Sequence, residues 1–292
     1  MYSNASTEKS PKHLELAPES SLPLTRIDST PRSLPSQFAE YWRYRELLYF
    51  LAWRDVRVRY RQTFLGVAWA ILQPALAMLL FTIFFGRFAA MPSDGIPYAV
   101  FAYAGLLPWT FFSNAVTSAG QSLITNPDLI SKVYLPRMLV PSAAVLAGLL
   151  DFAITFALLI VLMPYYHVSV AVSILLLPIP IFLAVLFALA ISLATAAVNV
   201  RYRDVRYALP FLIQTGLFVS PVIYPASLVS GSWRPLLLLN PLTGIIEGFR
   251  SALFGRPFDW VALAASAAVA VVVLFLSASY FRRVEAHFAD VI

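Results

Sequence analysis

The stretch NVRYRDVRYALPFLIQTGLFVSPVIYP, residues 199–225, decides how the rest of the chain is interpreted. It begins with a short loop rich in arginine, and from Tyr207 to Tyr224 it contains no charged residue. A helix rises about 1.5 Å per residue, so about 20 apolar residues cross a hydrocarbon layer roughly 30 Å thick. Such a run satisfies its backbone hydrogen bonds in lipid by forming a helix. The stretch therefore predicts a membrane-spanning helix that follows an arginine-rich loop.

The composition extends this interpretation to the whole chain. Of its 292 residues, 60% are hydrophobic and 12% are charged, whereas soluble domains carry about 25% charged residues. The absence of cysteine excludes disulfides and cysteine-based catalytic or metal sites. His13, His167 and His287 lie far apart, so no metal site is expected. The formal net charge of +6 comes from arginines at the ends of apolar runs, which indicates membrane topology and not nucleic-acid binding.

Six apolar runs are predicted to cross a membrane. They cover approximately residues 64–85, 98–119, 139–163, 170–198, 207–224 and 261–280. Most lysines and arginines precede the first and third runs, lie at 201–206 or follow the last run, and these positions all fall on one side. Because such connections stay in the cytoplasm, both termini are predicted to be cytoplasmic. The expected fold class is an all-α polytopic membrane protein with six transmembrane helices.

Two regions precede the transmembrane domain, which is assigned to residues 63–285. Residues 1–37 are rich in Ser, Pro, Thr and charge, and they predict a disordered cytoplasmic tail. Residues 38–62 combine aromatic residues at helical spacing with six arginines, a pattern typical of an amphipathic helix in the membrane interface. This helix either contacts a cytosolic partner or only anchors the chain to anionic lipid.

The cytoplasmic connection at residues 125–141 predicts a short helix between the second and third runs. Asn126 and Pro127 fit a helix start, and Leu129 and Ile130 give one side an apolar surface. A rigid helix of this kind is suited to docking into a groove of a soluble partner. Any short connecting loop shares this pattern, so docking and simple connection both stay open.

The connection between the fifth and sixth runs, on the opposite side, predicts a helical hairpin. Asn240 fits an N-cap, Pro241 the first helical position and Gly255 the helix end. The resulting helix of about 14 residues is too short to span a membrane. Together with the apolar run at 233–239, it predicts a re-entrant hairpin that enters the outer leaflet and returns.

A few polar residues within the apolar part of the chain are candidates for function. Glu247 and Arg250 lie three residues apart and are expected to pair, as the charged lining of an outer gate or as an ordinary surface ion pair. Asp151 is the only acidic residue within a predicted span. It faces a channel, pairs with a distant arginine or sits protonated in a helix contact. Gln73, Asn114, Asn199 and Gln214 are interpreted as interhelical hydrogen-bonding groups.

Aromatic residues make up 14% of the chain. Interfacial belts explain those near the ends of spans, but Trp69 lies within the first span. Aromatic rings that face a wet pore would offer weakly specific platforms to sugar rings; the alternative is packing within the bundle. No phosphate-binding loop, nucleophile elbow or HExxH motif occurs. The chain is therefore not expected to be an enzyme, and uphill transport requires an energy source on another subunit.

Four stretches, taken together and in order, resemble the transmembrane subunit of ABC-2-type exporters of polysaccharides, a family that includes O-antigen, capsule and teichoic-acid permeases. They are RVRYRQTFLGVAWAILQPALAMLLFTIFFGR (57–87), LISKVYLPRMLVPSAAVLAGLLDF (129–152), residues 199–225 and NPLTGIIEGFRSALFG (240–255). The resemblance extends from about Tyr41 to the C-terminus.

This resemblance implies a homodimer in the bacterial inner membrane that binds two ATPase subunits and exports a lipid-linked glycan. The chain itself would bind no cofactor, since ATP and Mg²⁺ belong to the partner. Expected ATPase-coupling residues are Asn126, Leu129, Ile130, Lys132, Arg137, Arg201, Asp204 and Arg206. Expected channel or gate residues are Trp69, Phe81, Phe218, Tyr224, Glu247 and Arg250. The alternative is an ABC-2 permease for a small hydrophobic drug or lipid, whose pore would favour aliphatic residues.

Overall fold

The regular secondary structure of the described part of the protein is helical, with no strand. The computed structural model describes residues 42–61, 66, 68–127, 129, 135–202, 204–229, 231–285 and 288. The predicted tail at 1–37 lies outside the described residues. Residues 43–292 form one unit, to which the helices described below belong.

Five helical segments in the described ranges are long and apolar enough to cross a membrane. They are α3 with the π-helical η1 (Ala68–Phe81 and Thr82–Phe88), α4 (Tyr98–Thr125), α6 (Leu139–Tyr165), η2 with α7 (Val172–Leu176 and Pro178–Arg201), and α11 (Trp260–Glu285). Each one corresponds to a predicted apolar run. They confirm the class of an all-helical polytopic membrane protein.

The remaining predicted span, residues 207–224, forms a shorter helix than expected. α8 (Val205–Val219) has 15 residues and rises about 22 Å, less than the roughly 30 Å of the hydrocarbon layer. Ser220 adopts an extended conformation with ψ of 148°. Since a residue before proline is pushed out of the helical region, Pro221 explains why α8 ends there. The helix is therefore a partial crossing on its own.

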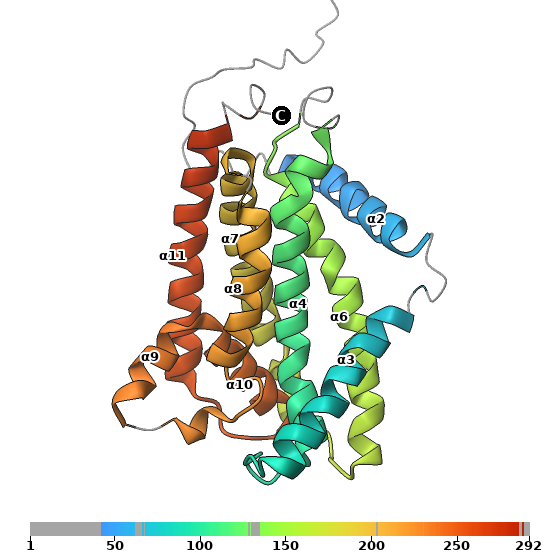
Figure 1. Ribbon diagram of the computed structural model, residues 1–292, viewed down its shortest axis with the longest axis vertical. Coiled ribbons are helices and arrows are strands. Elements are labelled where there is room, and N and C mark those ends of the chain that lie inside the picture. Colours follow the sequence, from blue (N-terminus) through green and yellow to red (C-terminus); the bar gives the residue numbers. More distant parts are fainter. Residues whose placement is uncertain are drawn as a thin grey trace, which may run out of the picture. The chain divides into compact units, whose positions relative to one another are not determined.

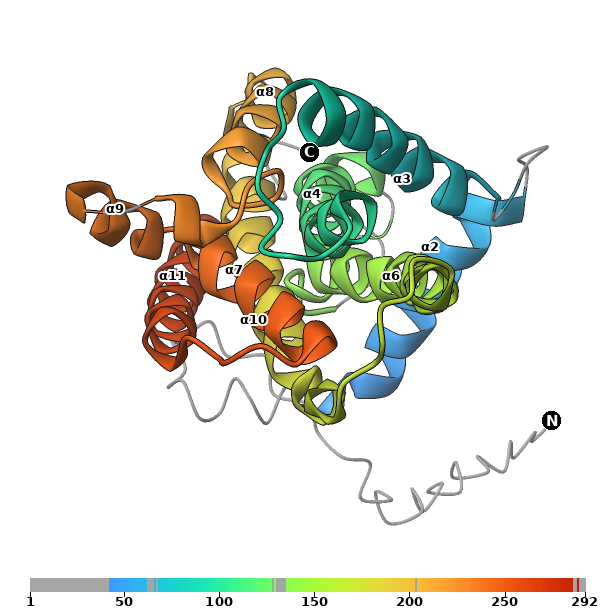
Figure 2. The ribbon, with the colours of Figure 1, turned by 90° about the horizontal axis from the view of Figure 1, so that it is seen from below.

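α4 is the central helix of the bundle (Figure 1). It packs against α3, α6, α7, α8 and α10 (Pro241–Phe254). In the most apolar stretch of α4, 83% of the residues are buried, whereas only 6% are buried in the corresponding stretch of Ala68–Phe88. In Figure 2, α3 and α8 lie on the same side of α4. That side of the bundle consequently presents two exposed helices.

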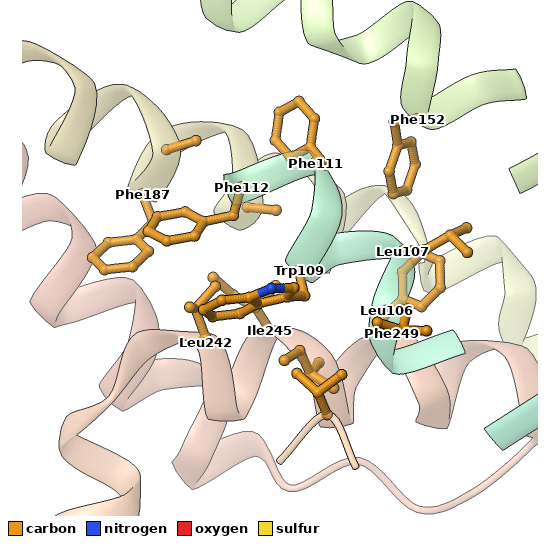
Figure 3. Close-up of a cluster of buried hydrophobic side chains, with 14 of the residues drawn as sticks. Leu106, Leu107, Trp109, Phe111, Phe112, Phe152, Phe187, Leu242, Ile245 and Phe249 are labelled. Atoms are coloured by element: carbon orange, nitrogen blue, oxygen red, sulfur yellow. The ribbon is translucent and has the colours of Figure 1, made fainter. Parts of the chain in front are cut away.

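Aromatic side chains fill the core between α4, α6, α7 and α10 (Figure 3). Phe112 of α4 stacks on Phe187 of α7, with 5.2 Å between the ring centroids. On the other side of α4, Phe111 meets Phe152 of α6 edge to face, and Phe152 also meets Phe249 of α10. Such pairs contribute about 0.5–1.5 kcal/mol each beyond the burial of their area. They fix α10 to the membrane-spanning helices.

Polar contacts join the connections at each end of the bundle. At the end predicted to be cytoplasmic, the Arg137 side chain, just before α6, donates to the backbone carbonyl of Glu285 at the end of α11. At the opposite end, Arg256, just after α10, pairs with Asp94 in the loop that precedes α4. The basic connection that precedes α6 and the basic end of α11 thus lie at the same end of the bundle.

Helix α2 (Arg45–Arg61) lies within the region predicted as an interface helix. It packs along α6 and slants across it in Figure 1. Tyr49, Phe50 and Trp53 on its surface are exposed. These aromatic residues are of the type that favours a membrane interface, and its position in the membrane stays a prediction.

The hairpin region consists of η3 (Ala226–Leu228), η4 (Gly231–Trp233), α9 (Arg234–Leu239) and α10. The predicted caps of α10 are confirmed. The Asn240 side chain accepts a hydrogen bond from the Leu242 amide at 3.1 Å, Pro241 occupies the first turn, and Gly255 ends the helix at φ 69°. Entry of this region into the membrane stays a prediction.

Candidate functional site

A groove with a volume of about 570 Å³ follows α3 and α4 on the exposed side of the bundle. Its walls come from α3, α4 and α6. The end of α2 closes it toward the side predicted to be cytoplasmic, and Leu217 of α8 borders its other end. Because it combines aromatic, amide and hydroxyl side chains, this groove is the candidate functional site.

On α3, residues that line the groove recur at every fourth position. Trp69, Gln73, Ala77 and Phe81 line it, and residues at this spacing share one face of a helix. From Trp69 to Phe81 the helix rises about 18 Å. Trp69 and Phe81 are both expected channel residues, and the structure places both in the groove.

The α4 wall carries a row of small polar side chains. The groove-lining residues between Leu106 and Ser118 span about 18 Å along the helix. The polar ones are Thr110, Ser113, Asn114, Thr117 and Ser118. This face is recognisable in the sequence as polar residues at a spacing of three and four within an apolar helix. Only Asn114 was singled out from the sequence, so the face as a whole was missed.

The amides of Gln73 and Asn114 face this groove and do not act as interhelical bridges. Within the described part of the chain, neither side chain makes a hydrogen bond to protein, so the interhelical bonds expected for them are not formed here. The interhelical bond expected for Asn199 is confirmed, because its amide nitrogen donates to the Gly120 carbonyl of α4 at 2.8 Å. An amide exposed to hydrocarbon without a partner costs several kcal/mol, on the order of 2–7. Gln73 and Asn114 are exposed, so they indicate a wet groove.

The outer surface of α11 provides the contrast. Between Trp260 and Arg283, which are exposed near its two ends, its exposed large side chains are hydrocarbons: Val261, Val271, Val272, Phe275 and Leu276. Such a surface is satisfied by lipid tails, whereas the groove is not. The bundle therefore has a surface suited to lipid and a different surface suited to water and polar solutes.

Asp151 closes the groove together with two residues of α2. Its carboxylate pairs with Arg59 and accepts a hydrogen bond from the Tyr60 hydroxyl. The alternative in which Asp151 pairs with a distant arginine is therefore confirmed. Burial and the hydrogen bond to Asp151 raise the pKa of Tyr60, so the hydroxyl keeps its proton and remains a donor. The cluster ties the end of α2 to α6.

A second pocket of about 670 Å³ lies at the opposite end of the bundle. Two ion pairs border it: Arg256 with Asp94 at 2.7 Å and Arg234 with Asp259 at 3.2 Å. Glu247 of α10 also lines this pocket. Glu247 therefore lies beside charged residues, and its position on the outer side stays a prediction.

Arg250 points into the protein and lines neither pocket. Its side chain is 1% exposed and pairs with Glu247 at 3.1 Å, as expected from their spacing. The guanidinium also donates to the carbonyls of Pro221 and Val222, each at 2.7 Å. In this conformation Arg250 therefore holds the segment after α8, while Glu247 faces the pocket.

The other two expected channel residues lie outside the groove. Phe218 is 58% exposed on α8. The Tyr224 hydroxyl donates to the Val219 carbonyl at 3.2 Å and stays at the end of α8. Among the residues of α8, only Leu217 borders the groove.

The expected coupling residues fall into four groups. Arg201 at the end of α7, Asp204 in the connection and Arg206 in the first turn of α8 are exposed. Asn126 ends α4, where its amide nitrogen donates to the Ser122 carbonyl at 2.8 Å, and Leu129 is half-buried. Ile130 and Lys132 lie outside the described residues. Arg137 is not freely exposed, because it is bound to the end of α11.

Comparison with known protein families identifies the family of this chain. Residues 46–254 match the family described as ABC-2 type transporter. The chain belongs to this family. It is 32% identical over 254 residues to the O-antigen export system permease protein RfbA of Myxococcus xanthus, covering 86% of this chain and 97% of that protein.

More distant ABC-2 relatives have related names. The chain is 23% identical over 249 residues to an O-antigen export system permease protein RfbA of Klebsiella pneumoniae, covering 85% of this chain and 95% of the relative. It is 25% identical over 234 residues to the polysialic acid transport protein KpsM of Escherichia coli, covering 80% and 91%. All three comparisons extend over most of both chains.

Proposed function

We propose that this chain is the membrane subunit of an ATP-driven exporter that moves a lipid-linked polysaccharide across the bacterial inner membrane. Its family and the names of its relatives support an O-antigen, a capsule polymer or a similar glycan as the substrate. The chain acts as a permease and not as an enzyme, and a separate ATPase subunit binds ATP and Mg²⁺.

The observation that carries this proposal is the mixed chemistry of the groove. Trp69 and Phe81 offer apolar rings on α3, while Asn114 and its polar neighbours offer hydrogen bonds on α4. A sugar has both kinds of surface, because its C–H groups pack on aromatic faces and its hydroxyls donate and accept hydrogen bonds. A permease for a hydrophobic drug or lipid would instead require an aliphatic lining, and the unpaired amides disfavour that alternative.

The exposed faces of α3 and α8 support assembly with a second copy of the chain. Both lie on the groove side of α4 (Figure 2) and expose large apolar side chains. Two copies that face each other across this side would enclose the groove as half of a channel. α8 and the following residues 220–224 would complete the sixth crossing, and α9 with α10 would form a re-entrant outer gate. Both termini are cytoplasmic in this arrangement.

Coupling to the ATPase would use the connections at the cytoplasmic end. ATP binding would draw two ATPase subunits together and displace the connection at 126–137 and the exposed loop at 201–206. This displacement would separate α3 from α8 and move the outer hairpin. Since a long polymer does not fit in a closed cavity, the path is a continuous channel.

Copurification and export assays test the proposal. Tagged chain isolated from its native membrane should bring down an ATPase with a Walker motif in equimolar amounts. Deletion of the chain should leave the polymer inside the cell, and the wild-type chain should restore export. ATP hydrolysis by the purified chain alone, or export that persists without it, would contradict the proposal.

A further inference from the structure

We infer that the polar face of α4, together with Gln73 of α3, is a hydrogen-bonding track along which the hydroxyl groups of the exported glycan move. The inference rests on the proposed function and makes it specific. It assigns substrate contact to the second membrane helix, opposite the aromatic residues of α3. The residues that carry it are Gln73, Thr110, Ser113, Asn114 and Thr117.

The first argument is the hydrogen-bonding state of these side chains. Thr110 and Thr117 donate within α4 to the carbonyls of Leu107 and Ser113, at 3.0 and 2.8 Å. Their oxygen atoms keep the capacity to accept a further bond. The amides of Gln73 and Asn114 have no protein partner in the described part of the chain. The track therefore offers both donors and acceptors to a solute.

The second argument is the geometry of the groove. The aromatic face of α3 extends for about 18 Å from Trp69 to Phe81, and the polar face of α4 extends beside it for about 12 Å from Thr110 to Ser118. Both line the same cavity. A sugar between them is able to place its C–H face on Trp69 or Phe81 and its hydroxyl groups on α4. A glycan hydroxyl that breaks its hydrogen bond to Asn114 meets Thr110 one helical turn further along α4. Each broken bond is therefore replaced by another as the glycan advances.

The third argument is charge. The only charged side chains that line the described groove are Arg59 and Asp151, and they neutralise each other. An amide–hydroxyl hydrogen bond contributes only about 0.5–1.5 kcal/mol net, which is weak enough to break at each step. A carboxylate-rich polymer would find no uncompensated cation here. The track therefore matches neutral hydroxyl and amide groups of a glycan.

Cysteine labelling tests whether the track is wet and touches the polymer. The chain contains no cysteine, so Asn114→Cys and Gln73→Cys each introduce a single thiol. In membranes that contain the permease, its ATPase and the polymer, a charged methanethiosulfonate reagent should label both positions. Val272→Cys on the lipid-facing side should stay unlabelled, because a thiol in hydrocarbon does not ionise.

Labelling at positions 114 and 73 should fall severalfold while polymer is being exported, compared with a strain that makes no polymer. Unlabelled thiols would mean that another protein surface, such as a second copy, covers the groove. Labelling that is the same with and without polymer would mean that the glycan does not pass here. Either result would overturn the inference.

Isosteric variants test the contribution of the hydrogen bonds. We expect Gln73→Met combined with Asn114→Leu to reduce export about tenfold, since two exchangeable bonds are lost. Thermal stability should stay unchanged, because neither amide bonds to protein. Gln121→Leu, which removes an amide from α4 outside the groove, is the matched control and should export normally. Wild-type rates in the double variant would reject the track and leave the proposed function intact, whereas failure of the wild-type chain to export would reject the proposed function itself.

Discussion

The guanidinium of Arg250 lies over the ring of Phe101, 3.6 Å from its centroid. Arg250 belongs to α10, in the predicted outer hairpin, and Phe101 belongs to the first turns of α4. The same guanidinium donates to the Phe101 carbonyl at 3.3 Å and to two carbonyls of the segment that follows α8. One buried side chain thus fastens the hairpin and the end of α8 to the central helix.

Replacing Arg250 by methionine should destabilise the protein strongly. The change leaves the carbonyls of Pro221 and Val222 without this donor and Glu247 without its ion-pair partner. We expect a loss of about 3 kcal/mol or more in the free energy of unfolding, measured by thermal or denaturant unfolding in nanodiscs. Arg234→Met, which removes an exposed ion pair with Asp259, should cost less than about 1 kcal/mol. Equal effects of the two changes would contradict the role assigned to Arg250.

Gly105 is required by the close approach of Arg250 to α4. A Cβ atom at Gly105 would collide with a guanidinium nitrogen of Arg250 and would lie 2.9 Å from the carbonyl oxygen of Val222. Gly105→Ala should therefore destabilise the protein by about 1–3 kcal/mol. Gly148→Ala is the matched control, because the nearest atom, in Phe111, is 3.5 Å away. Thermal unfolding distinguishes the two, and a tolerated Gly105→Ala would show that the guanidinium shifts without cost.

Local signals predicted the parts of the fold that depend on neighbouring residues. The caps of α10 follow from Asn240, Pro241 and Gly255, because each acts on the backbone within a few residues. The five long spans follow from continuous apolar runs. The length of α8 was overestimated, because the apolar run in the sequence continues past Ser220 whereas Pro221 ends the helix.

The site was only partly predictable for a different reason. Trp69 and Phe81 were expected in the channel. The polar face of α4 was missed, because none of its residues is unusual in a membrane helix when it is considered alone. The Arg59–Asp151 pair joins residues that are 92 positions apart, and the sequence left it as one of three alternatives. Arg250 binds mainly backbone carbonyls, which no residue pattern reveals. These contacts arise from folding, not from local sequence.

Asp151 should control how firmly α2 is attached to α6. Asp151→Asn removes the negative charge that holds Arg59, and we expect faster hydrogen exchange in the last turns of α2. Tyr60→Phe removes one hydrogen bond and should have a smaller effect, about 1 kcal/mol. Exchanging the charges, Arg59→Asp with Asp151→Arg, should restore part of the protection of α2 against hydrogen exchange. If Asp151→Asn leaves exchange in α2 unchanged, the packing of α2 on α6 holds without the ion pair.

Arg206 provides the clearest test of coupling to an ATPase. It is exposed at the end predicted to be cytoplasmic, where it contacts only its neighbour Tyr207 among the described residues. Charge reversal by Arg206→Glu should therefore preserve folding but abolish most polymer export and the binding of the ATPase. Arg137 is less suitable for this test, because its bonds to Glu285 also hold α6 to α11.

The matched control for Arg206→Glu is Arg87→Glu, an equal change of charge on an exposed arginine at the opposite end of the bundle. Copurified ATPase and exported polymer are measured in both variants after thermal unfolding has shown intact folding. Because an ATPase reaches only the cytoplasmic end, Arg87→Glu should retain both activities. Loss of ATPase binding in Arg87→Glu would contradict the predicted orientation. Retention of ATPase binding in Arg206→Glu would exclude the connection between α7 and α8 from the docking surface.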